Sequence, residues 1–139
     1  MSKQTELAQV ADTITVDSGN VGIGTSSPAS LVHLESDTPV ITLRDTSAYS
    51  AGTGPYIQFQ GLDSGSTNRV FGQIYGLSNG SNSGQLAFYT RNSGSTAERM
   101  RLDSSGNLLV GKTSSALSGA GISLLSTGRG RFTLITLRF

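Results

Sequence analysis

The chain has 139 residues, 14% of them charged, and a formal net charge of +1. A charge this close to neutral excludes the strongly basic surface typical of nucleic-acid binding and provides no attraction to an anionic membrane. The lack of cysteine excludes disulfides and thiolate metal sites. Only 35% of the residues are hydrophobic, so a single copy has little material for a core, and oligomerisation is the usual remedy.

The first segment, residues 1–16, precedes the glycine-rich stretch. It has no apolar core of a signal peptide, and no apolar run in the sequence approaches the ~20 residues that span a bilayer. We therefore expect synthesis in the cytoplasm without membrane insertion. Residues 3–11 favour a short helix, and the β-branched run 13–16 (TITV) predicts a strand.

A glycine-rich neck is expected over residues 17–37. Its sequence GNVGIG places glycines between two β-branched residues, and glycine allows backbones to approach where no Cβ fits. We expect Val21 and Ile23 to share a core with other copies of the chain. Ser27 is a suitable N-cap with Pro28 after it, which predicts one or two helical turns.

Alternation of apolar and polar residues dominates residues 38–103 and predicts an antiparallel β-domain. In the last strand, Met100 and Leu102 are expected on one face, and Arg99 and Arg101 on the other. Polar turns rich in glycine and asparagine separate the strands. The predicted strands cover residues 39–45, 56–61, 69–76, 85–90 and 98–103.

An internal repeat relates residues 18–29 (SGNVGIGTSSPA) to residues 105–116 (SGNLLVGKTSSA). Each copy follows a short strand and an aspartate, so we expect the same turn, strand and glycine twice. Gly24 corresponds to Gly111, whereas Gly22 corresponds to Leu109. A side chain at Gly24 is therefore expected to be more damaging than one at Gly22. Residues 104–139 are expected to form a second neck and the C-terminal tip.

The last residues of that tip, 129–139 (RGRFTLITLRF), are largely apolar on both alternating faces. This pattern favours burial on both sides, in an oligomer core or against a partner.

Residues 106–113 read GNLLVGKT and literally match the phosphate-binding pattern G-x-x-x-x-G-K-T. The variable positions are strand formers, and two glycines follow where the phosphate-binding helix would run. We therefore reject nucleotide binding, and we expect no cofactor.

Candidates for catalysis or metal binding are few. His33 is the only histidine and has no second ligand nearby in the sequence, so a half-buried strand or turn position is favoured over a metal site. The scattered aspartates are interpreted as turn formers, although two of them could serve as the acid and base of a polysaccharide-cleaving enzyme. Arg99 and Arg101 favour salt bridges over a phosphate site. These aspartates are Asp12, Asp17, Asp37, Asp45, Asp63 and Asp103.

Two phrases, residues 17–45 and residues 98–115 (ERMRLDSSGNLLVGKTSS), resemble segments of tailed-bacteriophage tail fibres and related virion fibre proteins. In that family ERMR followed by GNVGIGT and a Ser-Pro recurs along the chain. The resemblance covers residues 17–45 and 98–125. It implies an elongated, all-β homotrimeric fibre with very little helix. Many family members are longer and end in a self-cleaving chaperone, to which nothing after Gly130 is similar.

The favoured hypothesis is a structural fibre protein of the virion, not an enzyme, that adheres to the host surface through several weak contacts. Its expected partners are two further copies, a host glycan or protein, and other virion proteins, to which residues 1–16 are expected to attach the chain. The alternatives are a capsid decoration or head fibre protein, and a trimeric tailspike that cleaves polysaccharide. Candidate receptor contacts are Tyr49, Tyr56, Tyr75 and Tyr89. Candidate trimer contacts are Val21, Gly22, Ile23, Gly24, Leu108, Val110 and Gly111.

Overall fold

The computed structural model describes residues 13–133 except 49, 81, 117–120 and 129, with no side chains for 131–133. The helix expected over 3–11, Tyr49, and most of the apolar run 129–139 lie outside the described residues. The described chain contains strands and no helix. It forms two units, residues 1–42 and 43–139, each treated separately below.

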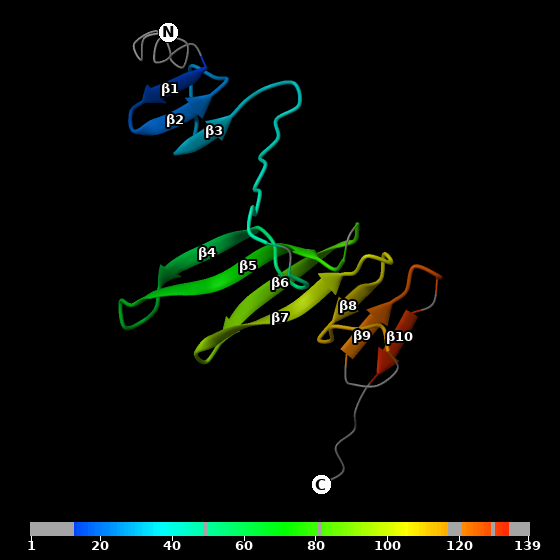
Figure 1. Cartoon of the computed structure of the whole chain (residues 1–139). Coiled ribbons are helices and arrows are strands. Elements are labelled where there is room, and N and C mark those ends of the chain that lie inside the picture. The colour runs from blue at the N-terminus through cyan, green and yellow to red at the C-terminus, as the bar shows by residue number, and fades with distance from the viewer. Residues whose placement is uncertain (1–12, 49, 81, 117–120, 129, 134–139) are drawn as a thin grey trace. The chain divides into compact units, whose positions relative to one another are not determined.

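The first unit contains a three-stranded sheet in the order β1-β2-β3. Strands β1 (Ile14–Asp17) and β2 (Asn20–Ile23) are antiparallel, and β3 (Val32–Leu34) runs parallel to β2 (Figure 1). The β1–β2 turn has positive φ at Ser18 (51°) and Gly19 (86°), as a two-residue hairpin of the primed type requires.

The small sheet has one wholly apolar face. The register pairs Val16 with Val21 and Val21 with Val32, and it pairs Ile14 with Ile23 and Ile23 with Leu34. Since side chains alternate along a strand, these residues share a face. The opposite face carries Thr15, Gly22 and His33.

The helical turns expected after Ser27 are absent, and this prediction is wrong. The backbone returns to β2 instead: the Val21 amide donates to the Leu31 carbonyl at 2.9 Å, and Asn20 Nδ2 donates to the Pro28 carbonyl at 3.2 Å. These bonds place residues 32–34 beside β2 as a strand. The capping pattern was outweighed by a strand partner that local sequence does not reveal.

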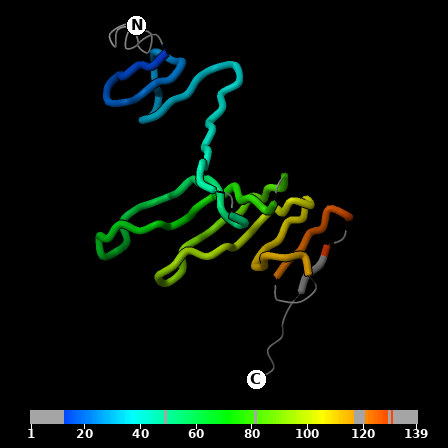
Figure 2. Tube along the Cα trace, in the orientation of Figure 1, coloured from blue at the N-terminus to red at the C-terminus, as the bar shows by residue number. Residues whose placement is uncertain are grey.

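The second unit contains one antiparallel sheet. Six strands pair in the order β9-β8-β7-β6-β5-β4, and the short β10 pairs with β9 at the edge. Figure 2 shows this chain path as a single layer. The strands are β4 (Tyr56–Leu62), β5 (Asn68–Ser78), β6 (Gly84–Asn92), β7 (Ser95–Leu102), β8 (Leu108–Val110), β9 (Gly121–Leu124) and β10 (Gly130–Thr133). Strands β8 to β10 thus extend the sheet beyond residue 103.

Two bulges change the alternation that the sequence suggests. Register shifts opposite Phe59/Gln60 and Phe88/Tyr89 leave Phe71 and Arg99 as extra residues in β5 and β7. Arg99 Nε therefore donates to Thr90 Oγ1, whereas Arg101 bonds Glu98 and Gln85 on the other face. The prediction that both arginines share one face is wrong for this reason.

The strand predicted at 39–45 is also absent. Residues 39–46 have no regular structure, and Val40, Ile41 and Leu43 are 76%, 69% and 47% exposed. Backbone groups of residues 38–44 form no hydrogen bond with the described chain. A strand needs a partner, and the described residues supply none for this segment.

Candidate functional site

One face of the large sheet carries rows of apolar side chains that run from β4 to β9. The register aligns one residue from each of six strands in a single cross-strand row: Ile57, Ile74, Phe88, Met100, Val110 and Ile122. A second row beside it contains Leu86, Leu102, Leu108 and Leu124. We call these ten residues the apolar face.

No strand of the second unit covers the apolar face, because all described strands of this unit lie in the one sheet. Ile57, Leu86, Leu102 and Leu124 are between 41% and 50% exposed. Leu77, Ala87 and Leu109 are the only buried hydrophobic residues described. Contiguous exposed apolar surface of this kind marks an interaction site, because leaving it in water is unfavourable.

The opposite face carries polar side chains, three of the four tyrosines and the buried residues Leu77, Ala87 and Leu109. The rings of Tyr56 and Tyr75 stack with centroids 4.5 Å apart, and those of Tyr75 and Tyr89 are 5.0 Å apart at an angle of 58°. Gln73 Nε2 donates to Gln58 Oε1 at 3.0 Å beside them. We call these three tyrosines and two glutamines the tyrosine face. The candidate contacts Tyr56, Tyr75 and Tyr89 are therefore brought together.

The tyrosine face is fixed by an ion pair next to Tyr89. Arg101 Nε donates to Glu98 Oε1 at 2.6 Å, and Tyr89 Oη donates to Glu98 Oε2 at 3.3 Å. Burial, followed by the charge of Glu98, raises the pKa of the Tyr89 phenol. Burial also raises the pKa of Tyr75. Both phenols thus remain neutral near pH 7 and can donate hydrogen bonds.

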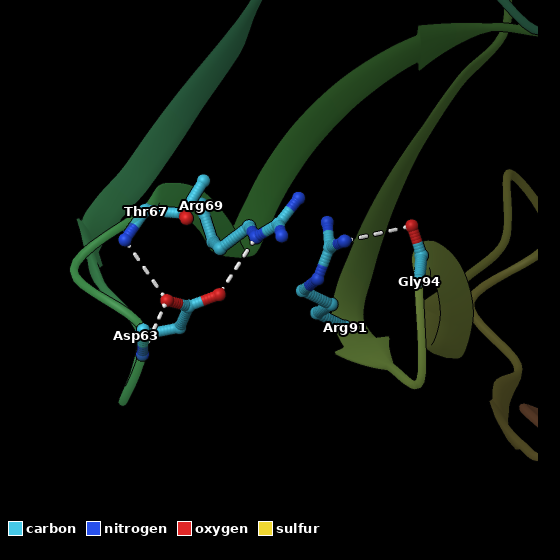
Figure 3. Close-up of polar contacts among 6 residues, drawn as sticks. Asp63, Thr67, Arg69, Arg91 and Gly94 are labelled. Atoms are coloured by element: carbon cyan, nitrogen blue, oxygen red, sulfur yellow. Dashed lines mark hydrogen bonds and ion pairs between the residues drawn. The ribbon is translucent and has the colours of Figure 1, made fainter.

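The carboxylates of Asp63 and Asp103 stabilise two strand-connecting loops with the same hydrogen-bond pattern. Asp63 Oδ1 accepts hydrogen bonds from the Gly65 and Thr67 amides, and Asp103 Oδ1 accepts them from Ser105 and Asn107. Figure 3 shows Asp63 also bound to Arg69 Nε, at 2.9 Å. In the same view Arg91 donates to the Gly94 carbonyl in the β6–β7 turn. The interpretation of Asp63 and Asp103 as turn formers is confirmed.

The glycines of the first unit are explained by contacts within the chain. Gly24 has a φ of +79°, and a Cβ there would lie 2.1 Å from the Glu35 carbonyl oxygen. A Cβ on Gly22 would lie 2.5 Å from the Thr25 carbonyl oxygen. A side chain is therefore unfavourable at both positions, and only Gly24 adds a positive φ to the close contact.

The remaining candidate trimer contacts lie on the apolar surfaces or at a turn. Val21 and Ile23 belong to the apolar face of the small sheet, and Leu108 and Val110 to that of the large sheet. Gly111 has a φ of +72°, and a Cβ there would lie 3.8 Å from its nearest neighbour, the Gly121 Cα. Leu109, the counterpart of Gly22 in the repeat, is fully buried on the tyrosine-face side.

The phosphate-loop pattern adopts a strand. Residues 108–110 form β8, and Lys112 Nζ donates to the Ala116 carbonyl at 2.7 Å. His33 is a half-buried residue of β3 whose Nδ1 accepts a hydrogen bond from the Ala29 amide, as a structural histidine would. Within the described residues, acidic and histidine side chains form no cluster of three that could hold a metal ion.

No family model matches the chain, and no curated protein or solved structure is significantly similar to it. Among the described residues no helix is long and apolar enough to cross a membrane. The apolar face and the tyrosine face are therefore the features from which a function can be argued. Alternation in single strands indicates each face, but the cross-strand rows depend on register and on the two bulges.

Proposed function

We propose that this chain is a structural fibre protein of a virion, a homotrimer that adheres to the host surface through repeated weak contacts. The observation that carries the proposal is the apolar face, which is continuous across six strands and is covered by no other described strand of its unit. A protein whose folding depends on covering such a face needs a partner present at equal amounts during folding. Another copy of the same chain always meets that condition.

Both units support association of identical copies. The small sheet also has a wholly apolar face, formed by Ile14, Val16, Val21, Ile23, Val32 and Leu34. Association through both faces would bury the large apolar residues that one copy leaves in water. Three copies rather than two are proposed because the phrases around Gly24 and Gly111 resemble trimeric fibres.

The tyrosine face is the proposed adhesion surface. With the apolar face turned toward other copies, the opposite face of each sheet is left toward solvent. Tyr56 is 48% exposed and lies beside the amides of Gln58 and Gln73, so a planar ring and hydrogen-bonding groups are presented together. Three such surfaces would bind with avidity rather than with a single tight site.

Adjacent substitutions on β4 test the assembly. Ile57 and Gln58 are neighbours, are both exposed in one copy, and lie on opposite faces. Ile57→Asp should dissociate the oligomer, whereas the matched control Gln58→Asp should leave its mass unchanged, as measured by light scattering after gel filtration. Equal masses for both variants would contradict the proposal.

The position of the protein on the particle separates adhesion from decoration. Antibody labelling of the virions that contain this chain should place it on the tail in electron micrographs. Labelling of the head would favour the decoration or head fibre alternative. Release of sugars from a host polysaccharide by the purified protein would favour the tailspike enzyme instead.

A further inference from the structure

Residues 39–44 (PVITLR) have every feature of a strand except a partner. In an extended chain Ile41 and Leu43 lie on one side, and Val40, Thr42 and Arg44 lie on the other. Their backbone groups make no hydrogen bond within the described chain. A β-branched, half-apolar segment in this condition is unfavourable in water, because both its side chains and its polar backbone can be better satisfied in a sheet.

Strand β4 also lacks a partner strand on one side. It ends the large sheet, so one edge of its backbone is unpaired in the described chain. Its sequence, YIQFQGL, contains no charge and no proline, which are the usual protections of an edge strand. Such an edge accepts an added strand through main-chain hydrogen bonds.

We propose that residues 39–44 of a neighbouring copy pair with the free edge of β4 and extend the large sheet by one strand. The alternation of the two segments matches. Ile41 and Leu43 would continue the apolar face beside Ile57 and Phe59, while Thr42 and Arg44 would continue the polar side beside Gln58. A shift by one residue would place Arg44 on the apolar face, so the pattern selects the side.

We assign the donor to another copy because residues 39–44 make no hydrogen bond within the described part of their own chain. Residues 52–55 already extend the line of β4, with the Gly52 amide bonded to the Ser78 carbonyl and the Gly76 amide to the Pro55 carbonyl. Residues 52–55 therefore pair with β5 and leave the outer edge of β4 without a partner. The inference rests on the proposed homo-oligomer, which brings the second copy to the sheet.

Cysteine cross-linking tests the pairing, because the natural chain contains no cysteine. A tagged Thr42→Cys chain is refolded together with an untagged chain carrying Cys at Tyr56, Gln58 or Gln60, which lie on the same side of β4. At least one mixture should give a disulfide-linked tagged–untagged species on oxidation. Ile41→Cys, on the opposite side, should give at least about tenfold less with the same partners.

Three results would overturn the inference. The first is the absence of mixed disulfide in all three mixtures although sedimentation shows intact oligomers. The second is a double variant, Thr42→Cys with Gln58→Cys, that forms only an intramolecular disulfide. The third is hydrogen exchange at unfolded rates by the amides of residues 40–43 in the unmodified oligomer, where pairing predicts slowing of at least about a hundredfold. A folded monomer would instead contradict the proposed function itself.

Discussion

Glu98 and Arg101 are three positions apart in one strand, yet their side chains meet on the same face at 2.6 Å. Residues at this spacing in a regular strand point to opposite faces. The extra residue Arg99 shifts the alternation and brings the pair together. The guanidinium of Arg101, in hydrogen bond with Glu98, has a raised pKa. The bulge thus places the ion pair of Glu98 and Arg101 beside Tyr89.

Loss of this ion pair should destabilise the large sheet. The side chains of Arg101 and Glu98 are only 15% and 10% exposed, so Arg101→Ala leaves a largely buried carboxylate without its cation. We expect a loss of about 2–3 kcal/mol in the free energy of unfolding, measured by urea denaturation. The neighbouring Arg99→Ala should cost about 0.5 kcal/mol or less, because Arg99 is exposed. Equal losses would argue against the role given to the bulge.

Acid should weaken the protein partly through Asp103. Burial raises its pKa, but hydrogen bonds from the Asn107 side chain and from the Asn107 and Ser105 amides outweigh burial and lower the pKa below its ordinary 3.8. The stabilising effect is therefore complete above that value and is lost as pH falls through the lowered pKa. Melting temperatures followed from roughly pH 7 to pH 2 should fall less steeply at the acid end for Asp103→Asn. An unchanged acid slope in this variant would contradict the assignment.

The two repeat glycines should differ in their tolerance of a side chain. Both have positive φ, but only at Gly24 would a Cβ strike backbone, at 2.1 Å from the Glu35 carbonyl oxygen. Gly111→Ala should cost about 1–2 kcal/mol for the backbone conformation alone. Gly24→Ala and Gly24→Val should cost more, and Gly22→Leu should also be damaging. Calorimetry that found Gly24→Ala milder than Gly111→Ala would show that residues 35 and 24 are not packed as described.

The phosphate-loop pattern should bind no nucleotide. Strand β8 occupies its variable positions, and the Lys112 ammonium is bonded to the Ala116 carbonyl. Addition of ATP and Mg²⁺ at about 1 mM should leave the melting temperature unchanged, because a ligand stabilises only a folded state that binds it. A rise in melting temperature that Lys112→Ala abolishes would restore the nucleotide hypothesis.

Alternation in the sequence located most strands of the large sheet. The segments around Ile57, Ile74, Phe88 and Met100 form strands as predicted, because one buried face imposes a period of two. The bulges at Phe71 and Arg99 could not be predicted in this way. A bulge depends on which residue the partner strand places opposite, and that information is absent from a single strand.

The tyrosine face and the structure of the first unit could not be predicted for the same reason, because both depend on contacts between separate segments of the chain. Tyr56, Tyr75 and Tyr89 meet because two hairpins set the register between their strands, which no local motif encodes. The turn after Ser27 has a helix-capping pattern but forms strand β3 through a partner beyond the turn. Gly22 was expected to matter less than Gly24 because its counterpart is Leu109, but a Cβ on Gly22 would also lie only 2.5 Å from the Thr25 carbonyl oxygen.

The central claim is that copies of this chain cover one another's apolar faces. Sedimentation equilibrium of the unmodified protein at about 10 μM tests it most directly, because an apolar surface of this extent should hold copies together at that concentration. The account predicts a mass three times the 14.4 kDa of one chain. A folded species of 14.4 kDa that unfolds cooperatively would contradict it.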